Sequence, residues 1–89
     1  MKFGEHFEKE RSHRSDRERI TLEMCTRVRH ETLYTERGRY GRTVYWGRVE
    51  EDDRIRYLRV VVEPDDHEIA TASFDRTYRR KAQRGERPR

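Results

Sequence analysis

This chain has few apolar residues, a single cysteine and no long hydrophobic run. Hydrophobic residues make up 30% of its 89 residues and charged residues 45%, whereas an average domain is roughly 45–50% apolar. One small domain with so little apolar material gains a thin margin of stability, so we expect a partner chain or a homodimer to add to it. The lone Cys25 excludes an internal disulfide and has no second thiol for a zinc or redox motif.

The chain also lacks the segments that direct proteins to or across membranes. No apolar run approaches the ~20 residues that span a bilayer, and the charged N-terminal stretch has no signal-peptide core. We therefore expect a cytoplasmic protein with no membrane partner.

Basic charge is concentrated at the C-terminal end. The formal net charge is +4, but seven of the 22 basic residues lie between Arg76 and Arg89, where Glu86 is the only acid. Residues 1–75 are therefore slightly acidic. All but three of the basic residues are arginines. The planar guanidinium of arginine suits phosphate binding, and a GC-rich genome would produce the same bias.

Residues 42–75 hold the only dense run of β-branched and aromatic side chains. They form three strand-like segments, Thr43–Val49, Ile55–Val62 and His67–Phe74, separated by acidic stretches at Glu50–Asp53 and Glu63–Asp66. Gaps of hairpin length predict an antiparallel β-meander. The unbroken apolar run at the end of the middle segment predicts a central strand.

The N-terminal third favours helices. Residues from Glu5 to His13 are good helix formers, and Ser15 followed by Glu18 has the S-x-x-E form of a capping box. Apolar residues that recur every four positions predict an amphipathic helix over residues 21–31, with Thr21 as a candidate N-cap.

Together these patterns predict an α+β fold with two N-terminal helices packed on a three- to four-stranded antiparallel β-meander. The fourth strand would follow Leu33, and Phe3 could give at most a stub of strand. We expect one domain over residues 1–78 and a basic, flexible tail over residues 79–89, with residues 76–82 able to form a short basic helix.

Five segments carry a resemblance to a known family: an N-terminal HFEK, the stretch Arg19–Glu23, a YWGRVEE strand, a RYLRVVVE strand and an IATASFDR ending. In this order they are similar to small bacterial proteins of the RelE/ParE/BrnT-like toxin superfamily. The resemblance covers roughly residues 5–80. The chain departs from the usual pattern in its reduced first strand and in having Ser73 where related chains often carry Ala.

The resemblance implies a compact sheet with two helices. Many members of the superfamily cleave RNA without a metal and are neutralised by an antitoxin encoded alongside, while others inhibit gyrase. It also implies that residues at or after the last strand help to hold RNA, which points to Arg76 and Tyr78.

Metal-free cleavage of RNA needs a base, an acid and cations at the phosphorus. Our candidate catalytic residues are His67, Tyr78 and Arg76, with His67 or Tyr78 carrying the proton. Strand alternation places Tyr57 and Arg59 on one face, where either Tyr45 or Arg48 could join them. Aromatic and arginine side chains on an open sheet bind RNA bases and phosphates. The candidate RNA-binding residues are Arg48, Tyr57, Arg59, Arg79 and Arg80.

Each candidate also has an ordinary structural explanation: a solvent-exposed strand end for His67, cross-strand ion pairs for the arginines and a solvated tail for the C-terminus. Trp46 and Cys25 fit the core, and four acids in a row at Glu50–Asp53 diverge, so we expect no metal and no cofactor. The sequence and the resemblance together predict a toxin-like protein that binds RNA, could cleave it and is paired with a cognate antitoxin. A non-catalytic nucleic-acid-binding or regulatory module and a homo-oligomeric interaction protein are the alternatives.

Overall fold

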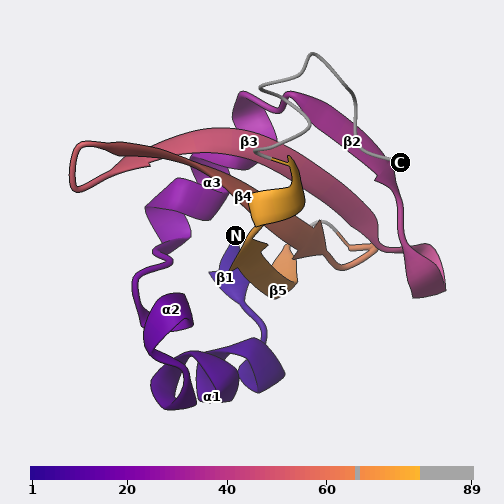
Figure 1. The fold of residues 1–89 in the computed structure, drawn as a ribbon. Helices are drawn as coiled ribbons and strands as arrows, with labels where there is room; N and C mark the ends of the chain where they lie inside the picture. Colours follow the sequence, from indigo (N-terminus) through magenta and orange to yellow (C-terminus); the bar gives the residue numbers. More distant parts are fainter. Residues whose placement is uncertain (66, 79–89) are drawn as a thin grey trace.

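A computed structural model describes residues 1–65 and 67–78 of the chain (Figure 1). Its helices are α1 (Glu5–His13), α2 (Ser15–Glu18) and α3 (Leu22–His30), with a 3-10 turn η1 (Arg39–Gly41). Its strands are β1 (Lys2–Phe3), β2 (Tyr34–Arg37), β3 (Thr43–Glu51), β4 (Arg54–Val62) and β5 (Glu68–Phe74). The α+β class predicted from the sequence is confirmed.

The strands form one five-stranded mixed sheet in the order β1-β5-β4-β3-β2. The prediction of a purely antiparallel sheet of three or four strands is therefore wrong at one edge, because β1 pairs parallel with β5. The Gly4 N–H donates to the Ile69 carbonyl at 2.9 Å, and the Lys2 ammonium lies 3.4 Å from the Glu68 carboxylate. A strand of two residues has no periodicity that a sequence pattern could reveal.

The β3–β4 hairpin is longer than its acidic sequence suggested. Glu50 and Glu51, expected in the turn, pair with Ile55 and Arg54, so that the loop contains only Asp52 and Asp53. Both loop residues have positive φ, 50° and 62°, as a two-residue type I′ turn requires. The hairpin arm extends beyond the rest of the sheet in Figure 1.

Three helices replace the two that were predicted. The Thr21 hydroxyl accepts a hydrogen bond from the Met24 N–H at 3.1 Å, which confirms Thr21 as the N-cap of α3. Ser15 is not an N-cap, contrary to the capping-box prediction. Arg14 occupies that position, and its carbonyl accepts the Arg17 and Glu18 N–H groups that close α2 as a separate helical turn.

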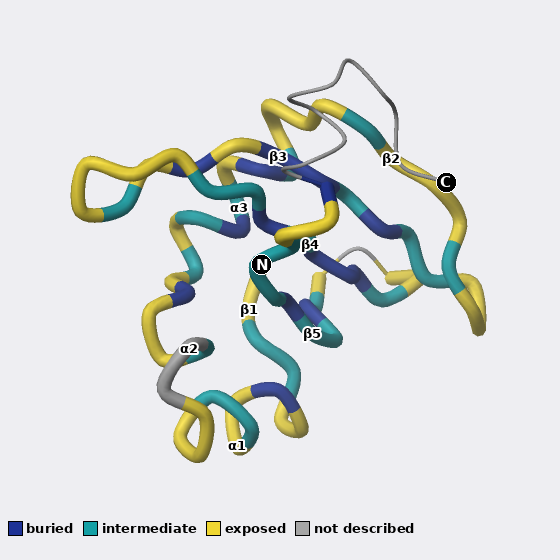
Figure 2. Tube along the Cα trace, viewed as in Figure 1, coloured by how far each residue is buried: buried dark blue, intermediate teal, exposed yellow. Residues whose placement is uncertain are grey.

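The main core lies between the helices and one face of the sheet (Figure 2). Phe7 from α1, Val28 from α3 and Leu58 and Val60 from β4 are all buried there. At Gly47 the helix comes so close that a Cβ atom would lie 2.9 Å from the Val28 methyl carbons. Burial along β4, between β3 and β5, confirms its predicted central position.

A second, smaller cluster lies on the opposite face, which we call the outer face. Val44, Trp46, Val61 and Tyr78 are its buried members. Tyr78 reaches it from a helical turn at residues 76–78 that follows β5. This turn covers part of the outer face and carries the exposed Arg76.

Candidate nucleic-acid interface

An open cavity of about 420 Å³ lies where β5 ends beside β4. β5 stops at Phe74, opposite Leu58, whereas β4 starts four residues earlier, at Arg54. The cavity is lined by Arg56, Arg59, Ser73, Phe74, Asp75, Arg76 and Thr77. Three arginines and one acid thus line the cavity.

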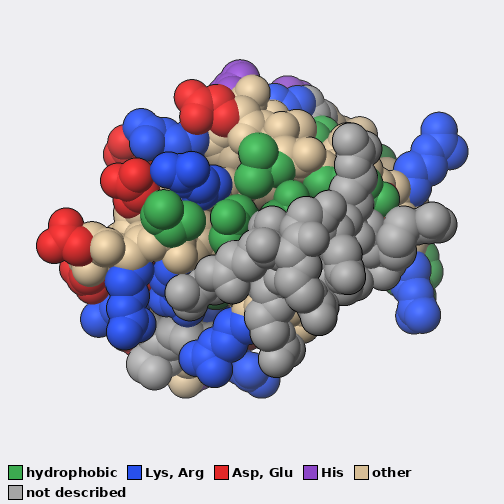
Figure 3. Space-filling view, turned by 45° about the horizontal axis from the view of Figure 1, so that its top comes forward, with side chains coloured by type: hydrophobic (Ala, Val, Ile, Leu, Met, Phe, Trp, Pro, Cys, Tyr) green, Lys and Arg blue, Asp and Glu red, His purple; other side chains and the backbone are tan. Residues whose placement is uncertain are grey.

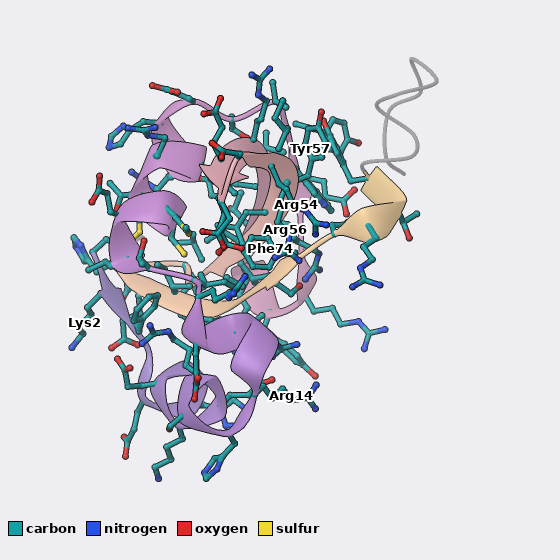
Figure 4. All side chains as sticks on the ribbon, turned by 60° about the vertical axis from the view of Figure 1, so that its left-hand side comes forward. Lys2, Arg14, Arg54, Arg56, Tyr57 and Phe74 are labelled. Atoms are coloured by element: carbon teal, nitrogen blue, oxygen red, sulfur yellow. The ribbon has the colours of Figure 1, made fainter. Side chains whose placement is uncertain are left out.

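The three arginines differ in how firmly they are held. The Arg56 guanidinium lies 3.5 Å from the centre of the Phe74 ring and 3.2 Å from the Glu51 carboxylate, so its position is set by two contacts (Figure 4). Arg59 lies 5.7 Å from the centre of the Trp46 ring on the outer face. Arg76 is exposed on the turn after β5. Arg56 is therefore part of the cavity wall, and the other two are better placed to meet a ligand.

Asp75 fastens this turn to the sheet. One carboxylate oxygen accepts a hydrogen bond from Trp46 Nε1 at 2.9 Å, and the other accepts the Tyr78 N–H at 2.8 Å. The Asp75 N–H donates to the Tyr57 carbonyl at 2.8 Å. The residue thus caps the turn and anchors it to β3 and β4, which determines where the neighbouring Arg76 stands.

Tyr78, a predicted proton carrier, is only 7% exposed. Its ring is stacked on Trp46 at a centroid distance of 6.3 Å and touches Tyr57 at 5.1 Å. Trp46 is itself buried, as expected of a core residue. The aromatic ring of Tyr78 therefore packs the turn against the outer face.

His67, the other predicted proton carrier, lies at the opposite end of β5 from Tyr78. It is exposed, and its carbonyl accepts the Lys2 N–H at 2.9 Å. The seven residues of β5, at about 3.3 Å each, separate the two ends by roughly 20 Å. His67 and Tyr78 therefore cannot act on the same phosphate, and His67 lies outside the arginine-lined cavity.

The strand register decides which residues share the outer face. Arg48 stands opposite Tyr57 and Trp46 opposite Arg59, while Tyr45 packs toward the helices. Of the two arrangements open from the sequence, the structure has the one with Arg48. The Arg48 side chain is 55% exposed, with Glu50 at 3.7 Å. Arg79 and Arg80 lie outside the described residues.

Figure 3 shows acidic side chains at the hairpin end of the molecule and Lys or Arg side chains interleaved with hydrophobic ones beside them. Surfaces that bind single-stranded nucleic acid set arginines beside aromatic rings, as Arg59 beside Trp46 and Arg48 opposite Tyr57 do here. No group of three or more His, Cys, Asp or Glu among the described residues could hold a metal ion. None of the described helices is long and apolar enough to span a membrane.

Two residues that build this interface had no role in the sequence prediction. Alternation sets Arg56 on the face of β4 opposite to Tyr57 and Arg59, which gives no reason to expect it at a ligand site. Asp75 could have been found, because Asp directly before a predicted helical turn is a common N-cap. Comparisons with protein-family models, curated proteins and solved structures found no match for this chain.

Proposed function

We propose that this protein is a toxin-like RNA-binding protein of the cytoplasm that holds RNA phosphates at Arg59 and Arg76 and is neutralised by a cognate antitoxin. The observation that carries the RNA-binding part is the convergence of three arginines on one open cavity. The antitoxin and the toxin class come from the family resemblance alone.

The outer face supplies a second requirement of RNA recognition. Tyr57 is half-buried on this face next to exposed Arg48, a short distance along β4 from the cavity. Single-stranded RNA is bound by stacking of bases on aromatic rings and by arginine contacts to the backbone. A strand that enters the cavity through its phosphate could continue over Tyr57 toward Arg48.

Cleavage of the bound RNA is the second candidate function, favoured by the exposure of Arg76 at the cavity. That position would allow Arg76 to stabilise charge on a phosphorus in the transition state. Proton transfer is less well provided, because His67 is remote and Tyr78 is packed among aromatic rings. The described residues therefore favour binding over catalysis.

The test compares binding of a fluorescently labelled single-stranded RNA by the full chain and by an Arg59→Ala/Arg76→Ala variant over a range of salt concentrations. Loss of two phosphate contacts should lower the salt slope by about 1.4, since each contact contributes about 0.7 on a single strand. Arg14→Ala is the matched control, because Arg14 is exposed at the end of α1, away from the cavity (Figure 4). The double variant Arg14→Ala/Arg37→Ala loses the same two positive charges as the Arg59→Ala/Arg76→Ala variant and so controls for net charge.

An equal loss of affinity in the control would show that net charge alone drives binding and would refute the site. The same RNA, examined for new 5′ ends, separates binding from cleavage. New ends made by the wild type and by His67→Ala, but not by the double variant, would establish a nuclease at the cavity. RNA that stays intact with the wild type and with every variant would leave RNA binding without cleavage as the function.

A further inference from the structure

β2 forms one edge of the sheet, and the side of β2 that points away from β3 has no strand partner among residues 1–65 and 67–78. Exposed edges of this kind are normally covered or interrupted by proline, because they pair readily with other chains. β2 contains no proline, and large exposed apolar side chains flank it, Leu33 at 57% and Tyr40 at 82% exposure. This inference does not depend on RNA binding.

Hydrogen bonding shows which backbone groups of β2 point outward. The carbonyls of Arg42, Val44 and Trp46 accept hydrogen bonds from the β2 side, from Gly38 N–H, Thr35 Oγ1 and Leu33 N–H respectively. The strand register sets Tyr34 and Glu36 of β2 opposite Trp46 and Val44. The even-numbered residues of β2 therefore direct their backbone N–H and C=O groups toward β3. Since bonding alternates along an antiparallel strand, Thr35 and Arg37 direct their N–H and C=O groups away from the sheet.

We propose that a second copy of this chain binds antiparallel along β2, with Thr35 on the two-fold axis. In an antiparallel strand pair, residues directly opposite each other point to the same face of the sheet. A two-fold axis normal to the sheet must therefore set one residue of the strand opposite its own copy. An axis at Glu36 or Arg37 would set like charges directly opposite each other, which destabilises a strand pair. An axis at Tyr34 would pair Thr35 with Leu33, whose N–H is already donated to Trp46.

The axis at Thr35 sets no like charges opposite each other, and it meets the occupied Leu33 N–H only at the two ends of the pairing, where Leu33 stands opposite Arg37. It sets the two Thr35 residues opposite each other with reciprocal N–H to carbonyl bonds, and Thr–Thr pairs are favourable across strands. Tyr34 of each copy then faces Glu36 of the other, and the Leu33 side chain is covered by the stem of Arg37. The resulting ten-stranded sheet would carry both outer faces, each with Tyr57 and Arg59, on the same side, because the two-fold axis is normal to the sheet.

The test is sedimentation of the full chain over a wide concentration range, with Thr35→Lys and Thr35→Glu measured separately and then mixed. Thr35 is exposed, but either change also removes the hydrogen bond from its hydroxyl to the Val44 carbonyl, so the fold of each variant is measured as well. We expect a wild-type dimer, at least about fivefold weaker self-association of each variant from the like-charge pair, and recovery in the mixture as a Lys–Glu heterodimer. Ser12→Lys, the same change of charge on an exposed site of α1, should dimerise like the wild type.

A wild type that is monomeric at every concentration would overturn the proposal. So would Lys and Glu variants that self-associate as strongly as the wild type, or a mixture that recovers nothing. Emission of Trp46, which is buried, reports whether each variant is folded. Thr35→Pro serves if a charged variant unfolds: it removes an outward N–H that the sheet does not use, as edge strands tolerate, and should also weaken the dimer.

Discussion

Asp75 offers the sharpest test of how the outer face is built. In Asp75→Ala the indole N–H of Trp46 loses its acceptor at 2.9 Å and the turn at residues 76–78 loses its N-cap. A buried donor left unsatisfied costs about 1–3 kcal/mol and a lost N-cap about 1 kcal/mol. The free energy of unfolding should therefore fall by about 2–4 kcal/mol, a large part of the total for a domain of this size.

The assay is thermal unfolding followed by tryptophan fluorescence, since Trp46 is the only tryptophan in the chain. We expect Tm to fall by roughly 10–30 °C and the native emission to shift to longer wavelength as water reaches the indole. Asp75→Asn keeps one acceptor oxygen and should lose less. Glu50→Ala is the control, because this exposed carboxylate is 3.7 Å from Arg48 and holds no buried donor. Wild-type Tm and emission in Asp75→Ala would refute the anchoring role.

Two further predictions concern the helix side of the sheet. Gly47→Ala should cost about 1–3 kcal/mol of unfolding free energy in urea titrations, because its Cβ would lie 2.9 Å from the Val28 methyl carbons and push α3 away; wild-type stability would contradict that approach. Burial raises the pKa of the Cys25 thiol from 9.0 to about 12, against a smaller lowering by Arg11. The thiol of the unfolded chain therefore ionises first. The stability gained by keeping the buried thiol neutral is complete below pH 9 and should be lost as the pH rises toward 12. Rapid reaction of the native thiol with a disulfide reagent at pH 8 would disprove its burial.

The middle of the sheet was predictable because its signal is local and dense. β-branched and aromatic residues in β3, β4 and β5 give both strand identity and the alternation that sets Trp46 with Arg48 in β3 and Tyr57 with Arg59 in β4. Alternation does not say which side the helices cover. That depends on the close approach of Val28 to Gly47, a contact between distant residues.

The parts that were missed depend on single contacts rather than on patterns. Parallel pairing of Lys2 with Glu68 joins the N-terminal residues to β5, and nothing in either short segment specifies the other. The hairpin turn was read as four residues because acids favour turns, yet the strand pairing continues to Glu51. At the candidate site, the sequence names Arg59 and Arg76 as candidates, but no sequence pattern indicates that Tyr78 is packed against Trp46 and Tyr57.

Parallel pairing of β1 with β5 also has a consequence for the order of folding. The β3–β4 hairpin closes through two residues, so its formation loses little loop entropy. In the sheet β1 pairs with β5, whose other neighbour is β4 of that hairpin. α1 follows β1 directly and packs against β5. We therefore expect the N-terminal strand and helix to dock after the hairpin has formed, and their amide hydrogens to exchange with solvent sooner than those of β4.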